Sequence, residues 1–188
     1  MSSEHTNRPA FSLIHGGLLE NATDGYKKFL SAYITDTRLM GVVGVYVHWL
    51  LPQNSIRNHF HQFFYFDAEE FGFDTYKSVL TTDDFDTEEF HEVEDSIIGG
   101  LGAKKVQLTE REVRYMVQEY IDLNRRMNLE LPSGFDEYKF LLYPRMELER
   151  TEEYVLMSKQ CSLLTSANQV ITYFLMRCFP KISVQPNS

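Results

Sequence analysis

The chain has 188 residues and a formal net charge of −9. This length favours one domain with a hydrophobic core of its own, and no apolar run approaches the ~20 residues that a membrane span needs. Proteins bind DNA and RNA first by neutralising phosphates with Lys and Arg, so the acidic balance argues against direct nucleic-acid binding. We therefore expect no nucleic-acid partner and no membrane association.

The two ends of the sequence and its cysteines predict the domain boundaries and the cellular compartment. The N-terminus is mostly polar and shows no secretory signal, and two isolated cysteines, Cys161 and Cys178, are typical of reduced thiols in a cytoplasmic protein. We expect a disordered lead-in over residues 1–10, a single α+β domain over residues 11–180 and a frayed tail over residues 181–188.

A helix is predicted over residues 23–35. Asn21 to Asp24 offers side chains that cap helices, and the apolar residues that follow recur at helical spacing. These residues are Tyr26, Phe29, Leu30, Tyr33 and Ile34. Such a stripe needs an apolar partner, and the next segment is the nearest in sequence.

The segment over residues 40–67 is the one around which we expect the sheet to form. Two stretches rich in β-branched and aromatic residues flank a polar loop, which predicts an antiparallel hairpin with a long connection. Alternate side chains of a strand share a face, and matching the two more apolar faces places Trp49 opposite Phe60. Val45 then lies opposite Phe64, whereas a slip by one residue would mix the two faces.

The same register gathers three histidines on the other face of the hairpin. His48 lies opposite His61, and His59 is one step along the second strand. Two or three imidazoles presented in this way could bind a divalent transition metal or supply a general base. The alternative is a partly exposed sheet face that carries His and Tyr without a ligand. No order of Ser, His and Asp or of Cys and His singles out a catalytic set, so enzymatic activity stays open.

Most of the negative charge belongs to one segment. Residues 67–95 contain twelve acidic residues and one base, Lys77, while the rest of the chain sums to about +2. Charge runs usually face water, which predicts a solvated loop or a short exposed helix anchored by Phe85 and Phe90. The functional hypothesis is a docking surface for a basic protein partner, with carboxylates that steer the encounter and phenylalanines as apolar anchors. Its candidate residues are Asp83, Asp84, Phe85, Asp86, Glu88, Glu89 and Phe90.

Residues 84–106 resemble two ligand-binding motifs, the EF-hand calcium loop and the phosphate-binding loop, but match neither of them. Five carboxylates fall at positions 1, 3, 5, 9 and 12 of an EF-hand-like loop, but Glu89 occupies the position that requires glycine. The five are Asp84, Asp86, Glu88, Glu92 and Asp95. The glycine-rich stretch from Ser96 to Val106 lacks the spacing of a phosphate-binding loop and predicts a flexible turn that leads into an extended segment.

The clearest predicted helix spans residues 109–127. Thr109 and Glu112 form a capping box, and one face of the helix is lined by residues at helical spacing. These are Val113, Met116, Val117, Tyr120, Ile121 and Asn124. Arginines cluster near the C-terminal end, where they suit the helix dipole, although this basic patch could also pair with the acidic segment of this chain or of another copy.

The last part of the chain predicts three extended segments and a helix. The extended segments cover residues 138–143, 146–150 and 154–157. A second capping box, from Ser166 to Gln169, begins a helix over residues 166–178 that is apolar almost all round. Such a helix is buried in the core of its own domain or against another chain.

Together these elements predict an α+β fold. We expect an antiparallel sheet nucleated by the hairpin at about 40–67 and covered on one face by helices at about 23–35, 109–127 and 166–178. The predicted function is that of a non-enzymatic intracellular interaction module that presents its acidic-aromatic surface to a basic partner, or that self-associates through its final helix. The alternative is a metal-dependent or histidine-based enzyme, or a ligand-binding protein, that uses the histidine-bearing face.

Overall fold

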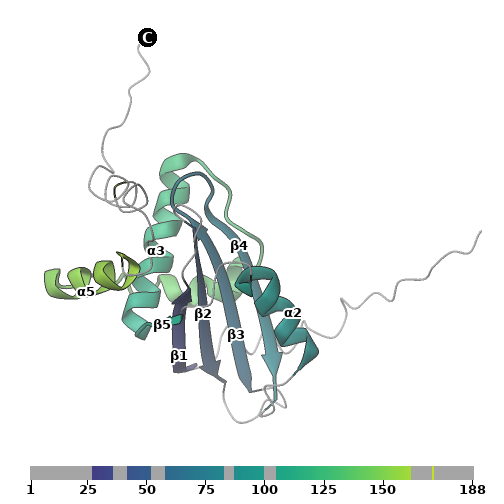
Figure 1. Ribbon diagram of the computed structural model, residues 1–188. Helices are drawn as coiled ribbons and strands as arrows, with labels where there is room; N and C mark the ends of the chain where they lie inside the picture. The colour runs from purple at the N-terminus through teal and green to yellow at the C-terminus, as the bar shows by residue number, and fades with distance from the viewer. Residues whose placement is uncertain are drawn as a thin grey trace, which may run out of the picture.

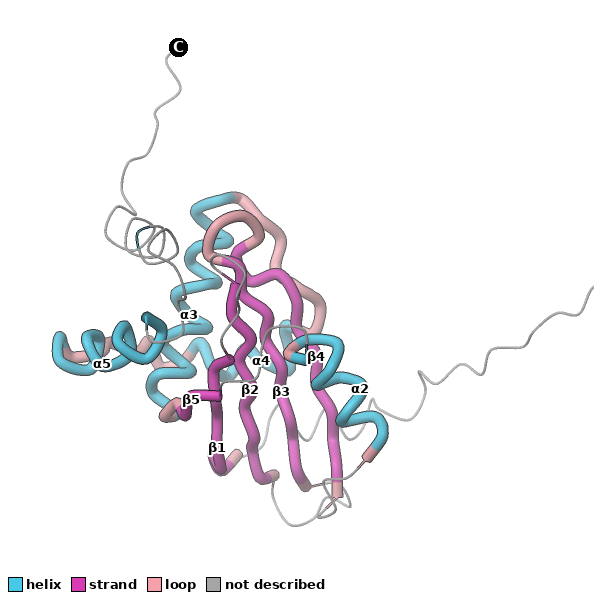
Figure 2. The backbone as a smooth tube through the Cα atoms, in the orientation of Figure 1, coloured by secondary structure: helices cyan, strands magenta, loops and turns pink. Residues whose placement is uncertain are grey.

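The computed structural model describes residues 27–35, 42–51, 58–82, 87–99, 105–161 and 171. Within them five antiparallel strands form one sheet in the order β4-β3-β2-β1-β5 (Figures 1 and 2). The strands are β1 (Lys28–Thr35), β2 (Val42–Leu50), β3 (His59–Asp67), β4 (Gly72–Thr81) and β5 (Lys105–Gln107). The helices are α2 (Glu88–Ile97), α3 (Glu110–Met127), α4 (Phe135–Tyr138), α5 (Arg150–Cys161) and the short 3-10 helix η2 (Lys139–Leu142). The predicted α+β class is confirmed.

The register between β2 and β3 is the predicted one. Three cross-strand pairs show this: Trp49 with Phe60, Val45 with Phe64, and His48 with His61. On the face of β2 and β3 that carries Trp49 and Phe60, all aromatic side chains are completely buried. Because each large aromatic removes about 150–250 Å² of surface from water, this face supplies much of the hydrophobic stabilisation of the fold.

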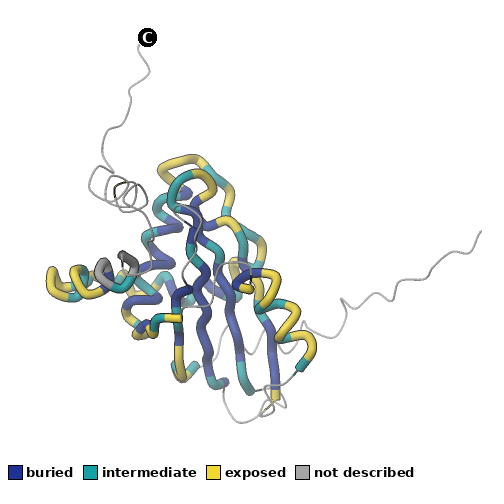
Figure 3. Tube along the Cα trace, in the orientation of Figure 1, coloured by how far each residue is buried: buried dark blue, intermediate teal, exposed yellow. Residues whose placement is uncertain are grey.

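Helices cover both faces of the sheet, so the prediction of helices on one face is wrong. α3 packs on the face that carries Trp49 and Phe60, whereas α2 packs on the face that carries Tyr46 and Phe63. Figure 1 shows α2 in front of β3 and β4 with α3 behind the sheet, and Figure 3 shows the central strands between them as deeply buried. The cause is visible in the sequence, since β2 and β3 are apolar or aromatic at most positions on both faces.

The prediction of a helix over residues 23–35 is wrong, because β1 occupies residues 28–35. β1 pairs with β2, and a bulge between Phe29 and Ser31 shifts its alternation by one residue. Phe29, Ala32 and Ile34 therefore contact the main core, whereas Tyr33 packs on the α2 face. The apolar residues that recur at helical spacing thus divide between the two faces of a strand. The first residues of the predicted range lie outside the described part of the chain.

α3 confirms the predicted helix over residues 109–127. The Thr109 hydroxyl accepts a hydrogen bond from the Glu112 N–H, and the Glu112 carboxylate accepts one from the Thr109 N–H at 2.7 Å. The predicted face is buried throughout: Val113, Met116, Val117, Tyr120, Ile121 and Asn124. A local capping motif and a regular apolar stripe were sufficient to define this helix.

None of the predicted extended segments, those over residues 138–143, 146–150 and 154–157, forms a strand, and the first and the last are mostly helical. α4, η2 and α5 occupy most of this region. Tyr138 and Leu141 are completely buried, and the Gln118 amide of α3 donates hydrogen bonds to the carbonyls of Leu141 and Pro144. These long-range contacts with α3 outweigh the strand propensity of the aromatic residues.

Other predictions fall outside the described residues. They concern the lead-in over residues 1–10, the helix over residues 166–178 except Ile171, the tail over residues 181–188, and Asp83 to Asp86. Ile171 is helical and 55% exposed. In the described part of the chain, no helix combines the length and the apolar character that a membrane span requires.

Asn124 of α3 satisfies the edge of β4 as a further strand would. Its side chain accepts a hydrogen bond from the Phe73 N–H at 2.6 Å and donates one to the Phe73 carbonyl at 3.0 Å. A side chain at Gly72 would collide with Asn124, and the φ of +64° at Gly72 also favours glycine. The buried backbone groups of Phe73 thus depend on one amide side chain.

We expect Asn124→Leu to lower the free energy of unfolding by about 2–4 kcal/mol, because leucine leaves the buried N–H and carbonyl of Phe73 without partners. Asn128 is the exposed left-handed C-cap of the same helix, and Asn128→Gly is the matched control. That control should change stability by less than about 0.5 kcal/mol. Urea denaturation measures both, and equal losses would contradict the role of Asn124.

Candidate functional site

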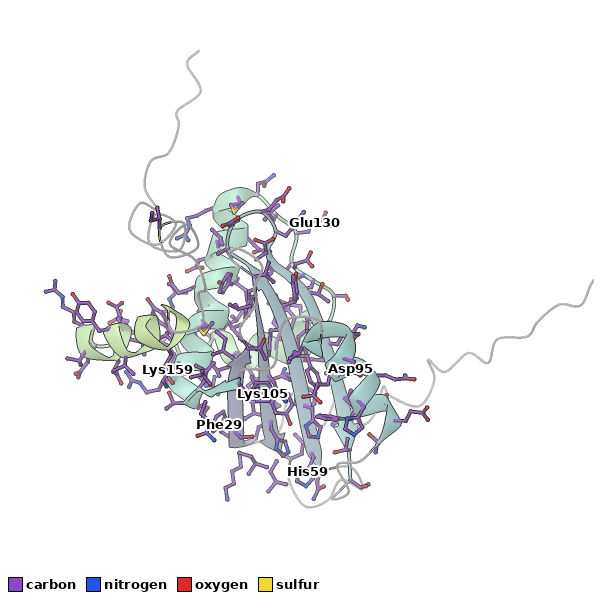
Figure 4. All side chains as sticks on the ribbon, viewed as in Figure 1. Phe29, His59, Asp95, Lys105, Glu130 and Lys159 are labelled. Carbon is purple, nitrogen blue, oxygen red and sulfur yellow. The ribbon has the colours of Figure 1, made fainter. Side chains whose placement is uncertain are left out.

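α2 has an inward side and an outward side. Phe90, Val93 and Ile97 recur at helical spacing and pack on the sheet. The carboxylates on the outward side are exposed: Glu88, Glu89, Glu92 and Asp95. Figure 3 shows the outer surface of α2 as exposed, and Figure 4 shows Asp95 pointing away from the sheet. α2 therefore packs its apolar residues on the sheet and displays four of its five carboxylates.

Local sequence accounts for where α2 begins. The Thr87 hydroxyl accepts a hydrogen bond from the Phe90 N–H at 3.3 Å, which caps the helix. Glu88 and Glu89 occupy the first turn, where the helix dipole favours negative charge. The EF-hand-like interpretation is excluded because Glu88, Glu92 and Asp95 all lie within α2 and therefore cannot surround an ion as the residues of a loop do.

Phe90 attaches α2 to the histidine-bearing face. Its ring centroid lies 4.9 Å from that of His61 and 5.6 Å from that of Phe63. It also meets Tyr46 edge-on at 6.1 Å. The sequence allowed Phe90 to anchor either its own segment or a partner, and the structure shows the first. Carboxylates accordingly make up four of the six exposed residues of α2, beside His91 and Ser96.

Glu94 is the carboxylate of α2 that turns inward. Its Oε1 accepts hydrogen bonds from the Tyr33 hydroxyl at 2.7 Å and from the Lys105 ammonium at 3.0 Å. Lys105 also lies 4.5 Å from the centroid of the Tyr33 ring, within the range of a cation–π contact. Since Tyr33 belongs to β1 and Lys105 to β5, Glu94 joins α2 to the far side of the sheet.

The pKa values of this cluster follow from burial and charge. Burial alone would raise the pKa of Glu94, but the hydrogen bonds from Tyr33 and Lys105 and the Lys105 charge outweigh it and lower that pKa. Burial raises the pKa of Tyr33 and of Tyr46, and Glu94 raises both further. Near neutral pH, Glu94 is therefore charged while both phenols keep their protons.

The three predicted histidines lie together on the α2 face. The His61 Nδ1 is 2.8 Å from the Tyr46 hydroxyl, and its Nε2 is 2.9 Å from the Thr81 hydroxyl. The His48 Nε2 is 2.8 Å from the His59 Nδ1. A neutral imidazole has one donor and one acceptor nitrogen, so each of these pairs can be satisfied without charge.

Both inner histidines are neutral near pH 7. Burial, followed by the neighbouring His48 and His59, lowers the pKa of His61 to about 3. Burial and His59 lower the pKa of His48 to about 4. His61 is completely buried and His48 is 6% exposed, so protonation of either ring would place a charge where water cannot solvate it.

The geometry gives the metal hypothesis for His48, His59 and His61 no support. The ring nitrogens named above face hydrogen-bond partners instead of converging on one point. Within the described ranges, no group of three or more His, Cys, Asp or Glu side chains is arranged to hold a metal ion. Of the three rings, His61 packs against Phe90 of α2.

A network of side-chain hydrogen bonds also crosses the α3 face of the sheet, where Gln62 lies among apolar residues. Trp49 Nε1 donates to Gln62 Oε1 at 2.8 Å, and Gln62 Nε2 donates to the Tyr76 hydroxyl at 2.9 Å. Tyr76 donates in turn to the Glu137 carboxylate at 3.1 Å. This chain satisfies the buried amide and links the hairpin to α4.

Sequence reasoning missed the inward role of Glu94 because it treated the acidic segment as one block. The spacing from Phe90 to Glu94 to Ile97 was a usable signal, since residues four and seven apart lie on one helix face. The partners of Glu94 had no such signal. Tyr33 follows a bulge, and Lys105 begins a strand of three residues.

The described residues have an α+β fold in which an antiparallel sheet carries an acidic helix on one face and its main core helix on the other. No family model, curated protein or solved structure matches the chain. Function must therefore be inferred from the residues of this site.

We expect stability to fall as the pH drops below about 6.5, the ordinary pKa of histidine. The unfolded chain binds protons on His48 and His61 that the folded chain does not bind. The loss extends down to about pH 4 for His48 and about pH 3 for His61. Chemical denaturation at a series of pH values measures this dependence.

His61→Gln should make this pH dependence shallower, by up to about 1.4 kcal/mol per pH unit. His91→Gln removes an exposed histidine of α2 and should leave the slope nearly unchanged. The slope is the readout, so a lower stability of His61→Gln at neutral pH does not obscure the result. Identical slopes in the two variants would show that His61 is not buried in its neutral form.

Proposed function

We propose that this domain is a non-enzymatic intracellular interaction module whose helix α2 docks against a basic protein partner. The observation that carries the proposal is the division of α2 into a side fixed on the sheet and a side that displays carboxylates. The displayed residues are Glu88, Glu89, Glu92 and Asp95.

The contacts beneath α2 support a surface that is ordered before a partner arrives. Thr87 caps the helix, Phe90 packs against aromatic rings in its middle, and Glu94 joins it to β1 and β5. A carboxylate array held in this way loses little conformational entropy on binding, which favours affinity.

The charge of α2 supports a basic partner. The helix contains five acidic residues and no Lys or Arg, and the ion pairs that the structure shows for it are those of Glu94 with Lys105 and His91. The outward carboxylates are thus not neutralised by bases of their own helix. An array of like charges accelerates the encounter with an opposite surface, and salt weakens this effect.

The alternative, a metal-dependent or histidine-based enzyme, has weaker support. A general base needs a nitrogen that faces the substrate and a pKa near the working pH. His61 packs beneath Phe90 of α2 and His48 is buried beside His61, with pKa values lowered to about 3 and about 4. Both features favour a structural role for these two rings.

A variant with three neutral replacements tests the docking surface. Glu88→Gln, Glu89→Gln and Glu92→Gln together should weaken binding of hexa-arginine at low salt by about tenfold or more, because the steering charges are lost. Fluorescence anisotropy of a labelled peptide measures the affinity, and the difference from the unmodified chain should shrink as salt is added.

The matched control makes the same change of net charge at three exposed positions outside α2: Glu130→Gln, Glu147→Gln and Glu149→Gln. It should weaken binding by less than about twofold, since surface charges distant from the contact contribute little. Equal losses in the two triple variants would mean that the peptide responds to net charge alone, and the proposal would fail.

A further inference from the structure

A hollow of about 400 Å³ opens beside the C-terminal end of α2, on the same face of the sheet. Its walls come from the end of β3, the turn into β4, the start of β4 and the last turn of α2. They include the rings of Tyr65 and Phe71 and the carboxylates of Asp67 and Asp74. The hollow therefore combines aromatic surface with negative charge next to the acidic side of α2.

Phe71 is the apolar feature of this hollow. It lies in the turn between β3 and β4 and is 51% exposed, although a phenylalanine is among the residues most often buried. Tyr65, on β3, is half-buried beside it in the same wall. Together they offer aromatic ring surface to a ligand, which suits a cation with a flat, weakly hydrated face.

The two carboxylates have different roles. Asp67 Oδ1 accepts hydrogen bonds from the N–H groups of Glu69 at 2.8 Å and Glu70 at 3.1 Å, so it holds the turn together. Asp74 is exposed and accepts a hydrogen bond from the neighbouring Thr75 hydroxyl at 2.8 Å. Asp74 is thus the carboxylate that a ligand can reach.

The surroundings are negative and rich in acceptors. Burial raises the pKa of Tyr65, and the charges of Asp67 and Asp74 raise it further. In the same turn, Glu69 Oε1 is buried without a hydrogen-bond partner among the residues that the structure describes. The cation of the lining, Lys77, donates to the neutral Ser96 hydroxyl at 3.0 Å. A positively charged ligand with N–H donors would complement the negative charge and the acceptors of this hollow.

A second hollow gives the contrast. It measures about 290 Å³ and lies where α3 begins, beside α5. Its charged side chains already form ion pairs with one another, Lys159 with Glu112 at 2.7 Å and Arg111 with Glu152 at 3.0 Å. These charges are neutralised within the chain, whereas Asp67 and Asp74 form no ion pair among the residues that the structure describes.

We propose that the hollow beside α2 binds an arginine side chain of the basic partner. Its guanidinium stacks on the ring of Phe71 or Tyr65 and donates hydrogen bonds to the Asp74 carboxylate. Arginine fits better than lysine because its planar, weakly hydrated group can stack and can donate two parallel hydrogen bonds. This inference rests on the proposed function, since it names the residue of the partner that the docking surface receives.

The test is an NMR titration of the full chain with two peptides, acetyl-Gly-Arg-Gly-amide and acetyl-Gly-Lys-Gly-amide. Amide shifts should centre on Tyr65, Phe71 and Thr75, and the arginine peptide should bind about threefold more tightly or better. Asp74→Asn should weaken its binding by about fivefold, and Phe71→Leu by a similar factor. Both positions are exposed, so these variants keep the fold.

Lys77→Gln gives a change in the opposite direction. Removal of this ammonium should strengthen arginine binding by about twofold, because a like charge leaves the hollow. Shifts confined to α2, or an Asp74→Asn variant that binds as the unmodified chain does, would overturn the arginine site and leave the docking surface intact. If neither these peptides nor hexa-arginine produced shifts, the site and the proposed function would both be wrong.

Discussion

The pairing of β2 with β3 decides which side chains each face of the sheet presents. Neighbouring residues of a strand point to opposite faces, so the pair of Trp49 and Phe60 and the pair of His48 and His61 lie on different sides of the sheet. Each side then requires its own cover. An amphipathic helix with an apolar stripe, α3, covers the first, and the mixed helix α2 covers the second.

The two faces differ in what holds them together. On the α3 side, large apolar residues exclude water and the polar Gln62 is satisfied by its neighbours. On the α2 side, Phe90 rests on a hydrogen-bonded array in which His61 and Tyr46 are neutral. Such an array holds a helix in place without neutralising the carboxylates on its outer side. This division connects the fold to the proposed docking function.

Sequence alone could predict the elements that local patterns determine. The hairpin register followed from matching apolar faces, the histidine cluster followed from that register, and α3 followed from its capping box at Thr109. It could not predict β1, because apolar residues on both faces of this bulged strand recur at the spacing of a helix. The contacts of Tyr33 and Lys105 with Glu94 join segments far apart in the chain, and no local pattern encodes them.

A buried, neutral histidine face should hold α2 in position. Hydrogen exchange of backbone amides, corrected for intrinsic rates and followed from about pH 7 to about pH 4.5, measures this. Opening of α2 exposes His48 and His61 to water, where they bind protons below about pH 6.5. We therefore expect amides from Phe90 to Ile97 to lose protection first as the pH falls, while amides from Val113 to Ile121 of α3 remain protected. Simultaneous loss in both helices, or undiminished protection of α2, would contradict it.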